Sequence, residues 1–253
     1  MKCTGPSSKG VARGVMGKEL ARIGERGKVG QGRDTHSGLH RGGKLAYILG
    51  PDHGPRHSGT LMEFPDGDGA LKAFFAETRI YPGSPIKARW NSGNPIPSEV
   101  VPKRVRVLKG KGPHDYAHIG TPILVSAAFK DCVERLDPGR HGFFQVTLED
   151  RHGAARPEPF YLFNVVGRID AIIEAKSNLK TIGRGQVANW GYERRVGPWH
   201  CALDRTIIGD RACWIDIRYE FRWFCSERLS QLLKTHRLSG FNLDLYCAEL
   251  DPE

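Results

Sequence analysis

The sequence has no long hydrophobic run and no sign of a secretory signal. A membrane-spanning helix requires about 18 or more consecutive apolar residues, and no stretch of the chain approaches that length. The first twenty residues, MKCTGPSSKGVARGVMGKEL, contain no apolar segment of the kind found in signal peptides. We therefore expect a cytoplasmic protein that does not contact a membrane.

The cysteines form no motif. The chain has six of them and no CxxC pair: Cys3, Cys132, Cys201, Cys213, Cys225 and Cys247. A zinc site would need closer ligand spacing, and a disulfide framework is rare in a chain of 253 residues. Because Cys132, Cys225 and Cys247 lie in apolar segments, we predict buried, reduced thiols, as in proteins of the cytosol.

Catalytic and cofactor-binding motifs are also missing. The sequence contains no Walker A loop, no GxGxxG fingerprint after a strand and no GxSxG elbow, and GRGQ at 183–186 is too short for a phosphate loop. His114 and His118 stand four residues apart, but no third metal ligand accompanies them, and Pro113 leaves little room for a helix. We therefore predict no catalytic residue, no cofactor and no metal ion, which favours a binding protein over an enzyme.

The net charge of +10 is concentrated near the N-terminus. Within residues 1–43, nine Lys and Arg residues oppose three Asp and Glu residues, so this segment carries +6 and the other 210 residues carry +4. The segment is rich in glycine and poor in large apolar residues, so we expect a disordered basic leader. It lacks the interleaved aromatic residues that stack on bases, so nucleic acid is not the expected partner. A linker role and a later translation start, for example at Met16, are alternatives that the sequence leaves open.

Residues 44–253 have the composition of one globular domain, since the whole chain has 39% hydrophobic and 26% charged residues. We predict an α+β fold with a mixed, mostly antiparallel sheet and a few packed helices. Residues 44–110 form a looser N-terminal half, and residues 111–253 form the core half. The most hydrophobic stretch, 160–166, predicts a central strand that is apolar on both faces. Residues 203–216 resemble a hairpin.

The C-terminal segment predicts a strand, a capped helix and a returning strand. The run 217–225 is aromatic and alternating, as in a strand with one buried face. Ser226 can cap the N-terminus of a helix whose leucines share one face, and Gly240 can end that helix in the left-handed conformation. Residues 241–245 alternate as the next strand.

The same unit occurs once more, 100 residues earlier. The positions offset by 100 are Ser126, Phe129, Cys132 and Val133 from Ser226, Leu229, Leu232 and Leu233. A strand at 123–125 leads into the predicted helix, Gly142 ends that helix, and the following strand opens at Phe143. Any capped helix between strands shares much of this pattern, and two copies do not make a solenoid. We interpret the two strand–helix–strand units as structural units that pack the core and carry no catalytic or ligand-binding residues.

Three polar residues interrupt the most hydrophobic region: Asn164, Arg168 and Asp170. Such groups need partners when buried, because an unpaired one costs about 1–3 kcal/mol. One interpretation is a functional site in a cleft. The other, which we favour, is a structural or interface network, built from an Arg168–Asp170 pair or from a bond between Asn164 and the backbone.

Five segments carry a family resemblance: TPILVSAAFKDCVE, FFQVTLED, PFYLFNVVGRIDAI, RTIIG and FRWFCSERLSQLLKTHRLSGFNLDL. The Phe/Tyr-x-Leu-x-Asn-Val pattern and the stretch from Ser-Glu-Arg-Leu to Ser-Gly-Phe are the most specific parts. On these segments, residues 121–250 resemble the immunity-protein domain of bacterial polymorphic-toxin systems, a family of the myxobacterial type that was first catalogued as a domain of unknown function. Residues 44–110 resemble its looser N-terminal half weakly, and residues 1–43 do not match it.

The resemblance implies a non-enzymatic, cytoplasmic α+β protein that binds and neutralises a toxin domain encoded beside it. Toxins of such systems are often nucleases of the His-Asn-His type. Inhibitors of basic nucleases are usually acidic, whereas this chain stays basic outside its leader, which argues against mimicry of nucleic acid.

Two hypotheses from other classes stand beside the immunity protein. One is a nucleic-acid-associated protein that uses the basic leader, whose affinity would fall steeply with salt. The other is an enzyme with a cleft at Asn164, Arg168 and Asp170, which requires these side chains to converge on an open pocket. The oligomeric state and the interface residues are left open by the sequence.

Overall fold

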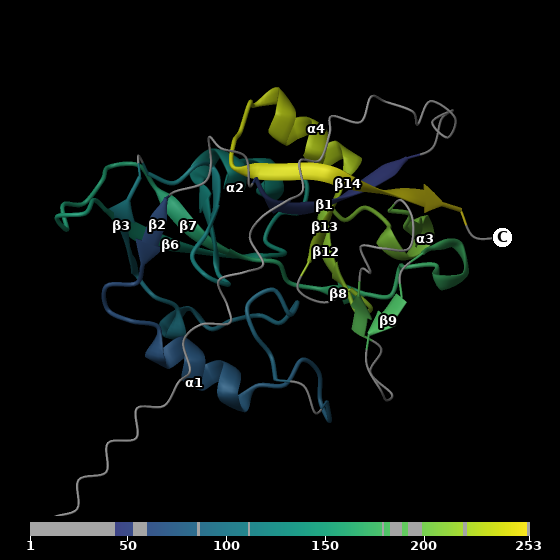
Figure 1. The fold of residues 1–253 in the computed structure, drawn as a ribbon, viewed down its shortest axis with the longest axis horizontal. Coiled ribbons are helices and arrows are strands. Elements are labelled where there is room, and N and C mark those ends of the chain that lie inside the picture. The colour runs from purple at the N-terminus through teal and green to yellow at the C-terminus, as the bar shows by residue number, and fades with distance from the viewer. Residues whose placement is uncertain are drawn as a thin grey trace, which may run out of the picture. The chain divides into compact units, whose positions relative to one another are not determined.

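The computed structural model describes residues 44–52, 60–84, 87–110, 112–178, 180–182, 189–191, 199–219 and 222–251. The predicted leader lies outside these ranges. The described chain folds into two six-stranded sheets, a two-stranded ribbon and four α-helices, which confirms the predicted α+β class (Figure 1). Strand pairing is mixed and mostly antiparallel, as predicted, but the strands are divided between two sheets.

The helices are short. They are α1 (Gly69–Glu77), α2 (Ala127–Glu134), α3 (Arg205–Ile208) and α4 (Glu227–Thr235), with 3-10 turns at Ser98–Val100 and Glu174–Lys176. Each of α2 and α4 lies between two strands of one sheet in the chain, and the two helices contact each other.

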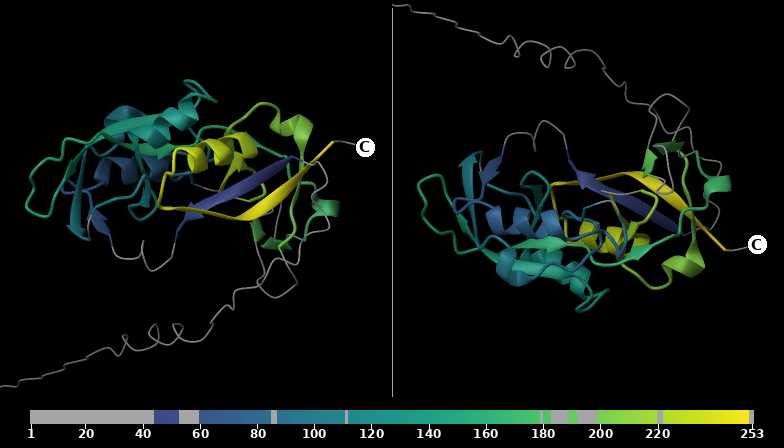
Figure 2. Two further views of the ribbon diagram at one scale, coloured as in Figure 1. Left: turned by 90° about the horizontal axis from the view of Figure 1, so that it is seen from above. Right: turned by 90° about the horizontal axis from the view of Figure 1, so that it is seen from below.

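Sheet A joins the two ends of the described chain. Its strand order is β11-β14-β1-β13-β12-β8. The bounds are β1 (Leu45–Pro51), β8 (Arg168–Ile169), β11 (Ala202–Asp204), β12 (Cys213–Asp216), β13 (Trp223–Ser226) and β14 (Phe241–Leu250). Because β1 pairs antiparallel with both β13 and β14, the first and last strands lie side by side (Figure 2).

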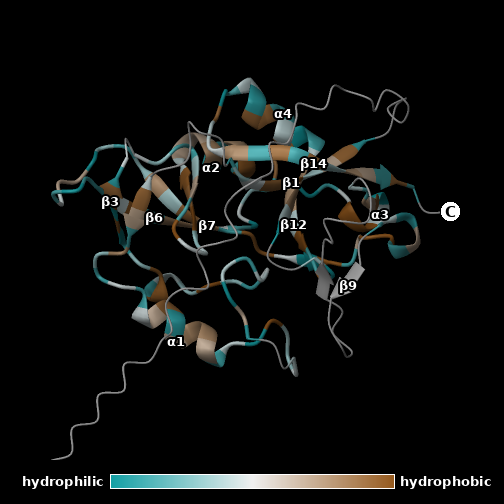
Figure 3. Ribbon diagram, viewed as in Figure 1, coloured by the Kyte–Doolittle hydropathy of each residue, from teal (hydrophilic) through white to brown (hydrophobic). Residues whose placement is uncertain are grey.

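Sheet B contains the predicted central strand. Its order is β2-β3-β6-β7-β5-β4. The bounds are β2 (Leu61–Glu63), β3 (Arg104–Lys109), β4 (Tyr116–His118), β5 (Ile123–Ser126), β6 (Gly142–Glu149) and β7 (Phe160–Asn164), and the ribbon is β9 (Lys180–Ile182) with β10 (Asn189–Gly191). β7 lies between β5 and β6, which confirms the prediction, and β6, β7 and β12 carry hydrophobic residues (Figure 3).

The two sheets repeat one pairing pattern over five strands. In sheet B, β3 and β6 are parallel, and β6, β7, β5 and β4 follow in antiparallel pairs. In sheet A, β11 and β14 are parallel, and β14, β1, β13 and β12 follow in antiparallel pairs. β1 therefore occupies the place in sheet A that β7 has in sheet B. Each predicted strand–helix–strand unit is thus part of a larger five-strand unit. The second five-strand unit has the topology of the first after circular permutation, because β1 comes from the start of the described chain.

A tyrosine in each unit supports this equivalence. Tyr161 of β7 and Tyr47 of β1 pair with β5 and β13 one residue before the serine that ends each of those strands. A lysine of the adjacent helix lies over each ring: Lys130 Nζ is 5.5 Å from the Tyr161 centroid, and Lys234 Nζ is 5.3 Å from the Tyr47 centroid. Each cation–π contact adds a small attraction between the helix and the sheet beneath it.

The N-termini of α2 and α4 are capped as predicted. Ser126 Oγ accepts the backbone N–H of Phe129 at 3.2 Å, and Ser226 Oγ accepts that of Leu229 at 3.3 Å. Each bond satisfies one of the free donors at a helix start.

The prediction that Gly240 ends α4 is wrong. The left-handed residue at the helix end is Arg237, with φ of 53°. Its N–H donates to the carbonyl of Lys234 at 2.9 Å, and the N–H of Leu238 donates to the carbonyl of Leu233 at 3.1 Å. This pair of bonds is the Schellman arrangement, which closes a helix with a left-handed residue that is usually glycine.

Gly240 instead allows the two units to pack closely. It has φ of +94°, and a Cβ placed there would lie 2.1 Å from the carbonyl oxygen of Tyr116 and 2.7 Å from Cβ of His114. Beside it, Tyr116 N–H donates to the Ser239 carbonyl at 3.1 Å, and Ser239 N–H donates to Asp115 Oδ2 at 2.9 Å. The segment after α4 is thereby joined to the start of β4.

An equivalent junction joins the segment after α2 to the start of β12. Asp137 Oδ2 accepts the backbone N–H groups of Ala212 at 2.8 Å and Cys213 at 3.1 Å. The two units therefore exchange reciprocal contacts, each binding the first strand of the other at the end of its own helix.

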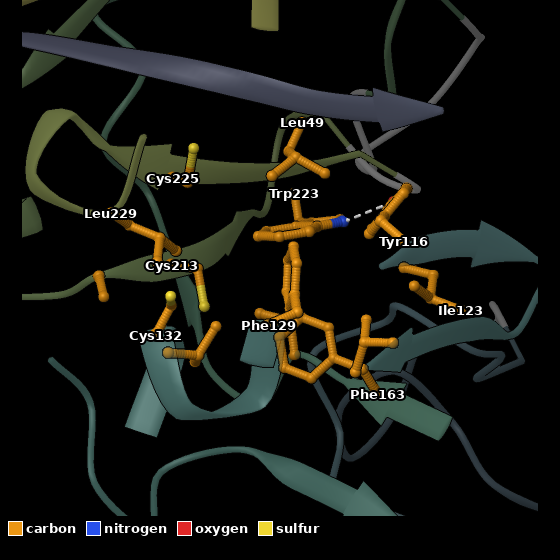
Figure 4. Close-up of a cluster of buried hydrophobic side chains, with 14 of the residues drawn as sticks. Leu49, Tyr116, Ile123, Phe129, Cys132, Phe163, Cys213, Trp223, Cys225 and Leu229 are labelled. Carbon is orange, nitrogen blue, oxygen red and sulfur yellow. Dashed lines mark hydrogen bonds between the residues drawn. The ribbon is translucent and has the colours of Figure 1, made fainter. Parts of the chain in front are cut away.

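Between the units lies a core of aromatic side chains (Figure 4). Tyr116, Phe129, Phe163 and Trp223 are each at most 1% exposed. The rings of Phe163 and Trp223 meet edge to face with centroids 5.4 Å apart, and Trp223 Nε1 donates to the Tyr116 hydroxyl at 3.3 Å. Because these residues come from β4, α2, β7 and β13, the core requires both units.

Two predicted elements are wrong. The run 217–225 is not one strand, because residues 217–219 form a turn and β13 begins at Trp223. Tyr219 nevertheless packs against the Phe224 ring, 6.2 Å away, which accounts for the aromatic pattern. Residues 203–216 are not a hairpin, because Asp204 accepts the N–H of Thr206 and starts the short helix α3.

Candidate functional site

Asn164 and Arg168 bind the same backbone segment. Asn164, at the end of β7, is 1% exposed, and its Nδ2 donates to the Asn94 carbonyl at 2.8 Å. Arg168 Nη1 donates to the Ser92 carbonyl at 3.0 Å. The two side chains thus meet on the 92–94 segment.

The 92–94 segment lies against the end of β7 with little space between them. Gly167 N–H donates to the Gly93 carbonyl at 3.0 Å. A Cβ at Gly93 would lie 2.4 Å from Cγ of Arg168, and the φ of +78° there also favours glycine. Trp90 Nε1 donates to the Phe163 carbonyl at 2.8 Å. The 92–94 segment is thereby packed closely against Arg168 and the end of β7.

Asp170 is paired with Arg218 in the turn after β12. The Nε and Nη2 groups of Arg218 donate to the two carboxylate oxygens of Asp170, the second at 2.9 Å. Next to them, Asp216 is fully buried and accepts the backbone N–H groups of Ala171 at 2.9 Å and Arg218 at 2.8 Å. Burial raises the pKa of Asp216 to about 6, although these bonds oppose the rise.

The sequence did not reveal one cluster of residues that are able to bind metals or act in catalysis: Asp137, His141 and Cys213. The candidate ligand atoms of the three residues lie within 4.8 Å of one another. His141 Nε2 is 3.1 Å from Asp137 Oδ2 and 3.1 Å from Cys213 Sγ, and the His141 and Asp137 side chains are 0% and 1% exposed. Cys213 stands 72 positions from His141, so local spacing offers no signal that would unite them.

The cluster does not fit a metal ion. Val166 N–H donates to His141 Nδ1 at 3.2 Å, which assigns the ring proton to Nε2, the atom that faces the other two residues. A metal-binding imidazole has the reverse arrangement, with the free nitrogen facing the metal and the other donating its proton. Asp137 Oδ2 already accepts the N–H groups of Ala212 and Cys213.

The cluster does not fit a nucleophilic thiol either. In a Cys-His-Asp relay the thiol and the carboxylate contact opposite ring nitrogens, whereas here both contact His141 Nε2. Burial first, and then the charge of Asp137, raise the pKa of the Cys213 thiol. We conclude that Asp137 and His141 join the two units and do not activate Cys213.

A known protein family covers the region that holds these residues. The model of the Immunity protein family (Imm11) matches residues 74–245, which is more than half of the chain. The chain belongs to this immunity protein family. The matched span includes β5, α2 and β6, then β13, α4 and the first half of β14, and it also contains Asn164, Arg168 and Asp170. No curated protein matches the chain. Among the described residues, no helix of this Imm11 member is long and apolar enough to cross a membrane.

A shallow cleft of about 340 Å³ lies between α3 and the start of α4 in this Imm11 member. Its walls carry charges of both signs. Two of its cations already bind backbone carbonyls, since Arg211 bonds Ile208 at 2.7 Å and Arg228 bonds Asp210 at 2.9 Å. Burial raises the pKa of Glu249 at the edge of the cleft. These arginines hold the α3–β12 connection in place.

We predict that the buried thiols of this Imm11 member are inert in the folded state. Cys132, Cys201, Cys213, Cys225 and Cys247 are free and buried. Burial raises the pKa of Cys132, Cys213, Cys225 and Cys247, and a buried thiol is out of reach of the reagent. In a Cys3→Ser variant, we expect a disulfide reagent to label no cysteine within minutes at pH 8, and all five after denaturation. Rapid labelling of Cys213 in the native protein, located by peptide mass mapping, would contradict the assignment.

Proposed function

We propose that this protein is an immunity protein that binds a cognate toxin domain and neutralises it in the cytoplasm of the producing bacterium. The observation that carries the proposal is the match of the immunity family over residues 74–245. Immunity proteins are generally non-enzymatic, so we propose inhibition by stoichiometric association and not by turnover.

The packing of the polar residues supports a binding role. Asn164 and Arg168 hold the 92–94 segment, and Asp137 and His141 join the two units. We propose that these four residues position the backbone and do not act on a substrate. A scaffold fixed in this way loses little conformational entropy on association, which favours tight binding.

The charge of the chain limits how the toxin is inhibited. Residues outside 1–43 carry a net +4, so the protein does not resemble a nucleic acid in charge. If the toxin is a nuclease, we propose that it is blocked at a surface other than its phosphate-binding groove, because two basic surfaces would repel each other.

The test is co-expression of the full chain with the toxin-like product of the neighbouring gene. We expect growth to be restored relative to an empty vector, and the two proteins to co-purify in a 1:1 complex. A shortened chain without residues 1–43 should rescue equally, because the family match lies outside that segment. Absence of both rescue and complex, with this protein present and folded, would contradict the proposal.

A further inference from the structure

The segment that follows α1 is basic and contains no carboxylate. Residues 78–98 include Arg79, Lys87 and Arg89 but no Asp or Glu. Arg168 adds a fourth cation, since its Nη1 donates to a backbone carbonyl of this segment at 3.0 Å. The segment therefore concentrates positive charge that no acidic side chain of its own offsets.

Two of these cations, Arg79 and Lys87, face each other. They are paired antiparallel in an isolated bridge. Ala88 N–H donates to the Thr78 carbonyl at 2.8 Å, so the two cations form a non-hydrogen-bonded pair, in which opposite side chains lie closest and the Cα atoms are about 4.5 Å apart. Like charges directly opposite each other in such a pair are destabilising. The fold therefore keeps a repulsion that a bound anion would relieve.

Arg79 and Lys87 are not neutralised by the rest of the described chain. Both side chains are exposed. Among the described residues, neither side chain has an ion-pair or hydrogen-bond partner, and this includes Glu77, the carboxylate nearest to Arg79 in the sequence. Asp170 is already bound to Arg218. The charges of the two cations are therefore available to a partner.

Burial alternates along both arms of this bridge. Ile80 and Ala88 are each 3% exposed, and Trp90 is 1% exposed. The residues on either side of Ile80 and of Ala88 are exposed, and Tyr81 among them is 44% exposed. Since alternate side chains of extended backbone point to opposite sides, the exposed ones share one face. This basic face consists of Arg79, Tyr81, Lys87 and Arg89.

Hydrogen bonds to the backbone hold both arms of the basic face in place. Asn94 Nδ2 donates to the carbonyls of Arg79 and Ile80, each at 3.3 Å. Ser92 Oγ accepts the N–H of Arg89 at 2.8 Å. The backbone that carries the cations is therefore ordered before a partner binds, which lowers the entropy cost of association.

We propose that the basic face is the surface at which this immunity protein binds an acidic surface of its toxin. This inference rests on the proposed function and names its interface. Carboxylates of the toxin bind Arg79 and Lys87 and remove the repulsion between them. Tyr81 supplies an exposed ring beside the cations, and Tyr and Arg are residue types that often dominate the binding energy of interfaces. The net +4 of the chain outside residues 1–43 acts in the same direction, since opposite charges steer association.

The test uses the full chain and a catalytically inactive form of the product of the neighbouring toxin gene. Arg79→Glu places a carboxylate opposite Lys87, so one substitution removes one cation and neutralises the other. We expect the affinity, measured by titration calorimetry, to fall by about tenfold or more. The melting temperature should equal or exceed that of the wild type, because an opposite-charge pair replaces the repulsion. Tyr81→Ala should also lower the affinity.

The matched control is Arg135→Glu, which changes the net charge by the same amount at an exposed position at the end of α2. This control should keep wild-type affinity, and thermal unfolding should show that every variant is folded. If the wild type does not bind, the proposed function fails. If the wild type binds and Arg79→Glu binds equally well, or the control loses as much affinity, the basic face is not the interface. Binding of a labelled DNA duplex that Arg79→Glu abolishes would overturn the inference in favour of nucleic acid.

Discussion

Gly240→Ala is expected to destabilise the protein by about 4 kcal/mol, most of it from one steric overlap. The new Cβ would lie 2.1 Å from the Tyr116 carbonyl oxygen, which is backbone and cannot rotate away. The two units would have to separate locally, weakening the Tyr116–Ser239 bond and the aromatic core behind it. Since a domain is typically stable by about 5–15 kcal/mol, this one methyl group removes a large share of the total.

Gly83→Ala is the matched control. Gly83 has φ of +81°, close to that of Gly240, but nothing lies within 4 Å of its Cβ position. Gly83→Ala should therefore cost only the strain of placing alanine at a positive φ, about 1 kcal/mol. Urea unfolding monitored by tryptophan fluorescence measures both variants. Equal losses of stability would mean that the overlap at the junction is relieved by small shifts, and that the close approach of the units is not required.

Asp137→Ala is expected to cost about 3–5 kcal/mol, because it leaves buried donors without an acceptor. The N–H groups of Ala212 and Cys213 and the Nε2–H of His141 all point at Asp137 Oδ2. Asp137→Asn keeps an oxygen for these donors but removes the charge, and it should cost about 2 kcal/mol. The difference between the two variants separates loss of the acceptor from loss of the charge.

The charge of Asp137 also predicts a pH dependence. Burial acts to raise the pKa of this carboxyl, but the bonds from His141, Cys213 and Ala212 outweigh it and hold the pKa below its ordinary value. A lowered pKa gives stability that is present above the unfolded-state value, about 3.9, and is lost as pH falls through the folded value. The difference in free energy of unfolding between the wild type and Asp137→Asn should therefore have its largest value at pH 6 and decrease below about pH 4.

Asp216 contributes a pH dependence of stability opposite in sign to that of Asp137. Its pKa of about 6 gives stability that is present below the unfolded-state value and lost as pH rises through 6. The contribution of Asp216 is the same in the wild type and in Asp137→Asn, so it cancels in the difference between their free energies of unfolding. The measurement is urea unfolding of both proteins from pH 3 to pH 7. A gap that does not change with pH would mean that Asp137 contributes as a hydrogen-bond acceptor and not as a charge.

Local elements were predictable because their signals are local. The caps at Ser126 and Ser226 depend on a side chain and an amide three residues away, and both are present. The offset of 100 residues between the two units corresponds to equivalent positions in the fold, since β5 with α2 and β13 with α4 occupy matching places in the two sheets. Predictions failed where a local signal has two outcomes. Gly240 was a good candidate for a helix end, but Arg237 takes that place.

The candidate residues show the same difference between local signals, which the sequence contains, and distant partners, which it does not reveal. Asn164 is a polar residue inside an apolar run, and the carbonyl that it binds belongs to Asn94, 70 residues away, a partner that the local sequence does not identify. The Asp137–His141–Cys213 cluster gave no local signal, because β12 brings Cys213 to the end of α2 only in the folded chain. Likewise, Arg79 and Lys87 are recognisable as a facing pair only once the backbone brings them together.

The sequence by itself determined the α+β class, the two capped helices, the apolar central strand and the family to which the chain belongs. These follow from periodicity, caps and motifs that span a few residues. Only the tertiary structure decided the division into two sheets, the use of β1 to complete the second unit and the position of Arg79 opposite Lys87. The physical reason is that strand pairing and buried hydrogen bonds join residues far apart in the chain, and many partners satisfy the same local pattern.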